Sequence, residues 1–233
     1  MLKSNLETVK ENIRKACERA GRREEEVQLI AVSKTKPVSD IMEVYSCGQR
    51  LFGENKVQEM CSKMDELPAD ISWHLIGHLQ TNKVKYITCR TTLVHSVDSL
   101  HLAEAISREA VKKGVSVPVL IEVNIAEEES KFGVKAQDLE KLVEQASLLP
   151  GIKIQGLMTI APYVEDPEEN RPIFRKLKQL SVDIDRKKFH NVTMNALSMG
   201  MTNDYEVAVE EGATFVRVGT AIFGARNYGT GEI

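Results

Sequence analysis

A lysine stands at the end of the most apolar strand-like segment of this chain. Residues 27–32 are mostly apolar and β-branched, as in a strand that is buried on both faces, and Ser33 and Lys34 follow them directly. Burying an ammonium group costs free energy, so Lys34 must reach water, find a partner or serve as an amine. Burial lowers the pKa of such an amine, which can then condense with a carbonyl to form a Schiff base. This segment alone leaves these interpretations open.

Glycines and hydroxyl residues follow the last two strand-like segments. Ser198 and Gly200 come after the first of these segments, and Gly219 and Thr220 come after the second. Hydroxyl donors, free amide groups and the close backbone approach that glycine permits are what a phosphate group needs. Either stretch alone could be only a turn with a helix cap. Together, and combined with the strand-end lysine, they favour a phosphate site.

An arginine interrupts the last strand-like segment. With the two-residue period of a strand, Arg217 shares a face with Phe215 and Gly219, so it points into the core. A buried guanidinium needs a partner. That partner is either Glu122 or another inner carboxylate, in a structural ion pair, or an acceptor such as a ring nitrogen on a cofactor.

The elements that position these residues alternate regularly. A helix over about residues 4–20 precedes the first strand, and the average strand spacing of about 27 residues is close to the roughly 30 residues of one (β/α)8 unit. A doubly wound sheet is the alternative, but no Gly-x-Gly-x-x-Gly follows any strand. We predict an α/β chain that forms a single (β/α)8 TIM barrel with an extra N-terminal helix. The predicted strands cover residues 27–32, 50–53, 71–76, 93–97, 117–124, 153–160, 192–197 and 214–218, and the helices between them cover about 37–48, 54–64, 80–89, 98–113, 136–149, 167–185 and 204–211.

Composition narrows the class of protein. The 233 residues show no linker or composition shift, so residues 1–233 are expected to form one domain. A net charge of −3 and a pI near 6.0 argue against bulk binding to nucleic acid or to an anionic membrane. The four cysteines are scattered, with neither a zinc motif nor a disulfide framework, and no apolar run approaches the roughly 20 residues of a membrane span. We expect a cytoplasmic protein.

In a TIM barrel the active site lies at the carboxyl ends of the strands. Lys34 and Asn55 follow the first two predicted strands, His74 lies in the third and Met158 in the sixth. A strand-end lysine, a phosphate cradle and an inner arginine together describe a pocket for pyridoxal 5′-phosphate (PLP). The candidate cofactor-binding residues are Lys34, Asn55, His74, Met158, Ser198, Gly200, Arg217, Gly219 and Thr220, and no catalytic residue or metal ligand is predicted.

Six collinear segments carry a resemblance to a known family. They cover nearly the whole chain in order and closely resemble the pyridoxal-phosphate homeostasis protein family, which shares the fold type III barrel of the alanine racemase N-terminal domain. His78 departs from the proline that many relatives carry, and Met199 departs from the usual leucine, which concerns the pocket rim. The segments are residues 31–37, 52–55, 73–77, 156–158, 197–201 and 217–224.

The resemblance assigns roles to individual residues. It implies that Lys34 holds the aldehyde of PLP, and that Lys36, just before Pro37, is the less suitable lysine. It also implies that Arg217 faces the pyridine nitrogen. The phosphate ligands that it implies are Ser198, Gly200, Gly219 and Thr220.

Two functions compete on this pocket. The first is a monomeric protein that buffers or delivers PLP without turnover, with apo PLP-dependent enzymes as potential recipients. The second is an amino-acid racemase, which would need a second base such as Tyr163 or His78 and, in alanine racemases, a further β-rich domain. An arginine at the ring nitrogen weakens the ring as an electron sink and favours the first function. A Schiff-base aldolase that acts on a sugar phosphate fits Lys34 and the phosphate loops but not the wider set of motifs.

Overall fold

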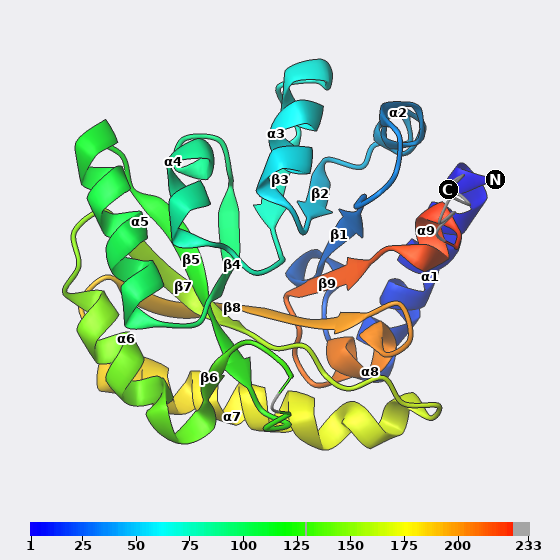
Figure 1. Ribbon diagram of the computed structural model, residues 1–233. Helices are drawn as coiled ribbons and strands as arrows, with labels where there is room; N and C mark the ends of the chain where they lie inside the picture. The colour runs from blue at the N-terminus through cyan, green and yellow to red at the C-terminus, as the bar shows by residue number, and fades with distance from the viewer. Residues whose placement is uncertain (129, 226–233) are drawn as a thin grey trace.

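Parallel strands form a closed ring at the centre of the computed structural model, which describes residues 1–128 and 130–225 (Figure 1). The strands are β1 (Gln28–Val32), β2 (Leu51–Glu54), β3 (Ser72–Leu75), β4 (Leu93–Val97), β5 (Val117–Asn124), β6 (Val134–Lys135), β7 (Ile152–Met158), β8 (Val192–Met201) and β9 (Phe215–Val218). Neighbours follow the order β4-β3-β2-β1-β9-β8-β7-β5, and a β4–β5 pairing closes the ring. The short β6 pairs only with the end of β5, so eight strands make the barrel.

Helices surround the ring (Figure 1). They are α1 (Leu2–Arg19), α2 (Val38–Ser46), α3 (Val57–Glu66), α4 (Val84–Ile87), α5 (Leu100–Lys113), α6 (Leu139–Ser147), α7 (Arg171–Lys187), α8 (Tyr205–Glu210) and α9 (Thr220–Phe223). The extra N-terminal helix α1 packs against α8 and α9, and the Asn5 side chain donates to the carbonyl of Ile222 at 2.9 Å. The predicted (β/α)8 TIM barrel with an N-terminal helix is confirmed.

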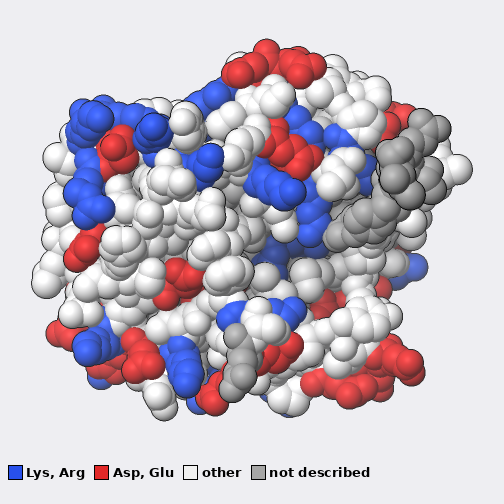
Figure 2. Space-filling model, in the orientation of Figure 1, with Lys and Arg blue, Asp and Glu red and all other residues white. Residues whose placement is uncertain are grey.

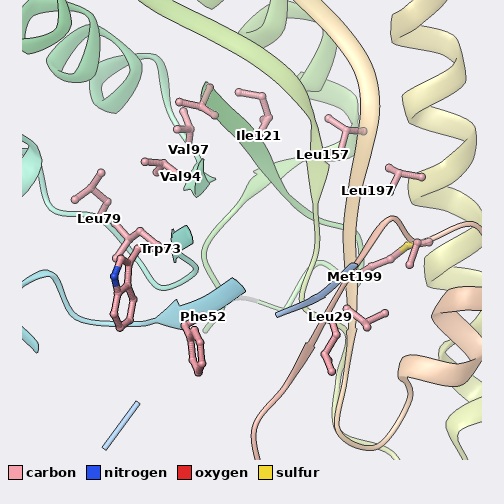
Figure 3. Close-up of a cluster of buried hydrophobic side chains, with 14 of the residues drawn as sticks. Leu29, Phe52, Trp73, Leu79, Val94, Val97, Ile121, Leu157, Leu197 and Met199 are labelled. Carbon is pink, nitrogen blue, oxygen red and sulfur yellow. The ribbon is translucent and has the colours of Figure 1, made fainter. Parts of the chain in front are cut away.

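Side chains of the strands alternate between the inside of the barrel and the helices outside it, as the two-residue period requires. The larger apolar core lies between strands and helices, and Figure 3 shows part of it, including Phe52 and Trp73. A separate cluster fills part of the barrel interior. Its members are Leu93, Leu120, Met158 and Ala196.

The largest departure from the predicted boundaries lies in β8. The sequence predicts a strand over residues 192–197, whereas β8 continues to Met201. The added residues pair with β9 through a register shift between Ser198 and Met201. Gly200 lies within this shift at a φ of +86°, and a Cβ there would lie 2.5 Å from the Cβ of Ala208. Pairing with a neighbouring strand, and not apolar character, therefore extends β8.

Two smaller departures involve short elements. The predicted helix over residues 80–89 is a 3-10 turn at Thr81–Lys83 followed by the single turn of α4. The two-residue β6 and the single-turn α9 are not predicted, because neither a pair of residues nor one helical turn repeats an apolar pattern.

Candidate functional site

A cavity of about 540 Å³ opens at the carboxyl end of the barrel. Figure 2 shows a hollow in the middle of one face, with lysine and arginine side chains gathered around it. Its volume is in the range of cofactor and small-molecule sites. The lining residues are Val32, Lys34, Lys36, Asn55, Ile76, Ile160, Pro162, Tyr163, Met201, Thr202, Asn203, Asp204, Arg217, Gly219, Thr220 and Gly224.

The two lysines after β1 have different surroundings. Lys34 is half-buried and lines the cavity. The ammonium of Lys36 donates to three backbone carbonyls, those of Phe223 at 2.9 Å, Gly224 at 3.2 Å and Ala225 at 3.1 Å. Lys36 is thus engaged with the segment at the end of α9, and both lysines lie at the cavity.

Beneath the turn that carries Lys34 lies a buried ion cluster. The Lys63 ammonium contacts Glu54 Oε1 and Glu59 Oε1, each at 2.7 Å, and donates to the Ser33 carbonyl at 2.8 Å. Ser33 Oγ donates to Glu54 at 2.6 Å, and the amide of Thr35 donates to Glu59 at 2.6 Å. The cluster therefore holds both residues that flank Lys34. It also holds Thr35 at a φ of +65°, a strained value for a β-branched residue.

Burial of the Glu54 carboxylate within this cluster is unfavourable in free energy. Glu54 is fully buried, and burial raises the pKa of its carboxyl, while Lys63 and Ser33 oppose that shift. Within the described residues its second oxygen has no hydrogen-bond partner. The sequence motif included Glu54, but nothing in the sequence pointed to Lys63, which stands in a helix among other charged residues.

A group of hydrogen-bonding atoms gathers where β8 and β9 end. The Gly219 amide lies 3.3 Å from Thr202 Oγ1, and Thr220 Oγ1 lies 3.2 Å from the same oxygen. All three residues line the cavity. Two hydroxyls and an amide at one point are a suitable donor set for a phosphate group. Thr202 was not among the predicted ligands, although it belongs to the hydroxyl- and glycine-rich stretch that drew attention to this place.

Two of the predicted phosphate ligands lie elsewhere. Ser198 is fully buried and bonds to Arg217 and His95, and Gly200 lies against α8; neither lines the cavity. Because β8 continues to Met201, the loop that faces the cavity begins four residues later than the sequence predicts. Gly219 and Thr220 do line the cavity, as the prediction requires.

The other predicted cofactor-binding residues also differ in whether they line the cavity. Asn55 lines the cavity, whereas His74 and Met158 are buried inside the barrel and do not line it. His74 Nδ1 lies 2.9 Å from His95 Nε2, and Met158 belongs to the interior apolar cluster. Both were predicted to contribute because their strands lead to the carboxyl face of the barrel, and their roles in cofactor binding stay predictions.

Arg217 reaches the cavity from the barrel interior. It is 4% exposed, and it donates to Ser198 Oγ at 2.5 Å and to the Thr159 carbonyl at 2.9 Å. No ion pair of Arg217 occurs among the residues that the structure describes, so the structural pairing with Glu122 is not formed. Burial lowers the pKa of Arg217 to about 10, against the raising effect of Glu122 and Asp204, and the guanidinium is charged at neutral pH.

Two residues considered as a second base lie at or near the rim. Tyr163 lines the cavity but is 85% exposed. The ring of His78 stacks on Phe132 with 3.9 Å between the ring centres, and its Nδ1 lies 3.4 Å from the Asp98 carboxylate.

Other site types were sought over the described ranges. They contain no group of three or more histidine, cysteine, aspartate or glutamate residues that could hold a metal ion. No helix there is long and apolar enough to cross a membrane. The four cysteines are free thiols.

Sequence comparison places the chain among characterised relatives. The family model of the alanine racemase N-terminal domain matches residues 4–227. The pyridoxal phosphate homeostasis protein of Aquifex aeolicus is 50% identical over 224 residues, which cover 96% of this chain and 97% of that protein. The protein of the same name from Escherichia coli K12 is 38% identical over 229 residues, which cover 96% of each.

Solved structures agree with the sequence comparison. PipY of Synechococcus elongatus, solved with PLP bound, has a TM-score of 0.83 at 36% identity, covering 96% of this chain and 100% of PipY. An alanine racemase of Clostridium difficile has a TM-score of 0.74 at 15% identity, covering 97% of this chain and 57% of the racemase, which shows a shared fold alone. The chain therefore belongs to the pyridoxal phosphate homeostasis protein family, on the barrel of the alanine racemase N-terminal domain.

Proposed function

We propose that this chain binds PLP and buffers or delivers it, holding the cofactor as a Schiff base on Lys34 and turning over no substrate. One observation carries the proposal. A single cavity brings together a lysine amine, an inner arginine, and a cluster of hydroxyl and amide donors. The aldehyde, the ring nitrogen and the phosphate of PLP require these three kinds of partner, so the residues present fit the cofactor.

Lys34 is the proposed covalent link. Its amine adds to the aldehyde carbon and water leaves, so that a C=N bond replaces the C=O bond. The ion cluster beneath the turn fixes the backbone on both sides of Lys34. The ammonium of Lys36 donates to three carbonyls of the segment at the end of α9, so a Schiff base on Lys36 would have to break these contacts.

Arg217 is the proposed partner of the ring nitrogen. In enzymes PLP acts as an electron sink, and it does so best when the ring nitrogen is protonated. A guanidinium donates a hydrogen bond but does not give up its proton at neutral pH. Arg217 would therefore hold the ring without activating it, which supports storage over racemisation.

The proposal has three finer parts. Apo forms of PLP-dependent enzymes receive the cofactor, the protein is a monomer, and it works in the cytoplasm. The open cavity, which an incoming amine can enter, supports transfer. A closed ring of strands needs no partner to cover a barrel edge, and four free cysteines suit a reducing compartment.

Transfer of the cofactor tests this function. We expect the PLP-loaded protein to activate an apo PLP-dependent enzyme while the absorption of the bound cofactor declines. Alanine incubated with the loaded protein should racemise no faster than it does with free PLP, as measured by chiral chromatography. Racemisation well above that control would overturn the non-enzymatic function and direct attention to Tyr163 or His78. A failure to activate the apo-enzyme would remove delivery from the proposal.

The phosphate end yields a second prediction. The double variant Thr202→Val with Thr220→Val removes two hydroxyl donors while keeping the shape of both side chains. Each hydrogen bond to a charged group contributes about 1.5–3 kcal/mol, so the loss of two should lower PLP affinity by about 10²- to 10⁴-fold. Affinity for pyridoxal, which lacks phosphate, should change little. Spectroscopic titration measures both ligands.

The matched control for the double variant is Thr193→Val. Thr193 is exposed near the start of β8, at the other end of the strand from the cavity, and its replacement should affect neither ligand. Equal losses of PLP and pyridoxal affinity in the double variant would mean that the phosphate does not bind at Thr202 and Thr220.

A further inference from the structure

A line of hydrogen bonds runs through the barrel interior away from the cavity. It begins at Arg217, which lies 2.5 Å from Ser198 Oγ, and continues from Ser198 Oγ to His95 Nδ1 at 2.9 Å. It ends with His95 Nε2 and His74 Nδ1, which lie 2.9 Å apart. The four residues come from β9, β8, β4 and β3, and none is more than 4% exposed. Strands on opposite sides of the barrel are thus joined by polar contacts through its interior.

Arg217 fixes the direction of every donor in this line. A guanidinium only donates, so Ser198 Oγ accepts from it. The buried Ser198 hydroxyl proton also needs an acceptor, and among the described residues His95 Nδ1 is the other side-chain partner of Ser198 Oγ, so we assign the proton to that contact. His95 must then be protonated on Nε2, from which it donates to His74 Nδ1. His74 is protonated on Nε2 for the same reason. The tautomers of two buried histidines therefore follow from the charge of one arginine.

Burial keeps both rings neutral. Burial lowers the pKa of His74 to about 4, and it lowers the pKa of His95 well below its ordinary value. The neighbouring His74 and the positive charge of Arg217 lower the pKa of His95 further. Only a neutral His95 can accept the Ser198 proton. The edges of both histidine rings also pack against Phe215, which limits their rotation.

The line begins at Arg217, the residue that the proposed function places against the cofactor ring. Ser198 holds Nη1 of Arg217, and the Thr159 carbonyl holds Nη2 at 2.9 Å. Two of the five guanidinium N–H groups are thereby tied to the barrel, which leaves the others for a ligand in the cavity. With both nitrogens anchored, the plane of the guanidinium cannot rotate freely.

We propose that His95 is a positioning residue for the cofactor: by accepting the Ser198 proton it orients Ser198 so that the guanidinium of Arg217 is aimed at the ring in the cavity. This rests on the proposed function, because Arg217 is taken as the ring partner. His95 itself does not line the cavity. It acts two contacts away, through Ser198.

Substitution of His95 tests this role. His95→Leu replaces the ring by an apolar side chain of similar size and so removes the acceptor. His95→Asn places an amide oxygen near the position of Nδ1 and so keeps an acceptor. We expect His95→Leu to weaken PLP binding about tenfold, the effect of one misplaced hydrogen bond, and to shift the absorption maximum of the bound cofactor. His95→Asn should restore most of both properties.

A matched control separates positioning from mere stability. Gln49 is also buried, and its side-chain amide donates to the Leu29 carbonyl at 2.7 Å, but it does not line the cavity. Gln49→Leu should lower thermal stability without shifting the spectrum of the bound cofactor. If folded His95→Leu kept both the wild-type affinity and the wild-type spectrum, the positioning role would be refuted.

A measurement without cofactor keeps the inference testable if His95→Leu fails to fold. Nitrogen-15 NMR of the histidine rings in the cofactor-free wild type should show His95 and His74 as neutral Nε2–H tautomers at neutral pH. A proton on Nδ1 of His95 would reverse the line and overturn the inference. Absence of PLP binding by the wild type would instead refute the proposed function, so the two failures can be told apart.

Discussion

Lys34→Ala is expected to abolish covalent capture of PLP. The wild-type protein, incubated with PLP and reduced with borohydride, should carry one stable adduct on Lys34, because its amine lies at the cavity together with the partners proposed for the ring and the phosphate. In Lys34→Ala the adduct should disappear, together with the visible absorption of the bound cofactor. Peptide mass spectrometry locates the adduct.

The phosphate donors remain in Lys34→Ala. We therefore expect equilibrium dialysis to detect residual, weaker binding of PLP by Thr202, Thr220 and the Gly219 amide. Lys56→Ala is the control, since Lys56 is exposed and does not line the cavity, and it should keep the full adduct. An adduct that moved to Lys36, or one that persisted unchanged in Lys34→Ala, would show that the wrong lysine had been assigned.

The sequence predicted the fold because the fold depends on repetition. Regular alternation of strand-like and helical segments, at a spacing typical of one (β/α) unit, left few alternatives to a closed barrel. It also predicted the cavity residues that lie just after a strand, such as Lys34 and Asn55. These positions follow from topology, since the carboxyl ends of parallel strands meet on one face.

The structure departs from the sequence-based placement where tertiary contacts decide the outcome. Ser198 and Gly200 have the composition of a loop, yet pairing with β9 and packing against α8 keep them within the strand. Thr202 takes the expected place at the cavity as a result. His74 lies in β3, as predicted, but its side chain is buried in the barrel interior, where it bonds to His95. Local sequence does not reveal how far a strand extends beyond its apolar run.

The role of Lys63 could not be predicted from local sequence, because only folding brings its ammonium to the Ser33 carbonyl, 30 residues earlier in the chain. Lys63→Met is expected to lower the free energy of unfolding by about 3–5 kcal/mol, the usual cost of removing one partner from a buried ion pair. The change leaves Glu54 fully buried without its cation and removes the donor to the Ser33 carbonyl. Chemical denaturation followed by circular dichroism measures the loss.

The loss should depend on pH in a defined direction. Burial already raises the pKa of Glu54 above its ordinary value, and without Lys63 the pKa should rise further. A carboxyl whose pKa is higher in the folded state favours folding below its unfolded pKa of about 4.3, and this contribution is lost as the pH rises through the folded value. Lys63→Met should therefore be closest to wild type near pH 4 and furthest from it above neutral pH.

Two further variants complete this test. Lys3→Met removes an exposed partner of Glu7 and should have little measurable effect, since surface pairs contribute little. The double variant Lys63→Met with Glu54→Gln also removes the carboxylate that Lys63→Met leaves unpaired. It should therefore regain part of the lost stability, and its stability should differ from wild type by a similar amount at acid and at neutral pH. A Lys63→Met deficit that stayed constant from acid to neutral pH would contradict this explanation, because it would mean that Glu54 remains ionised without its lysine.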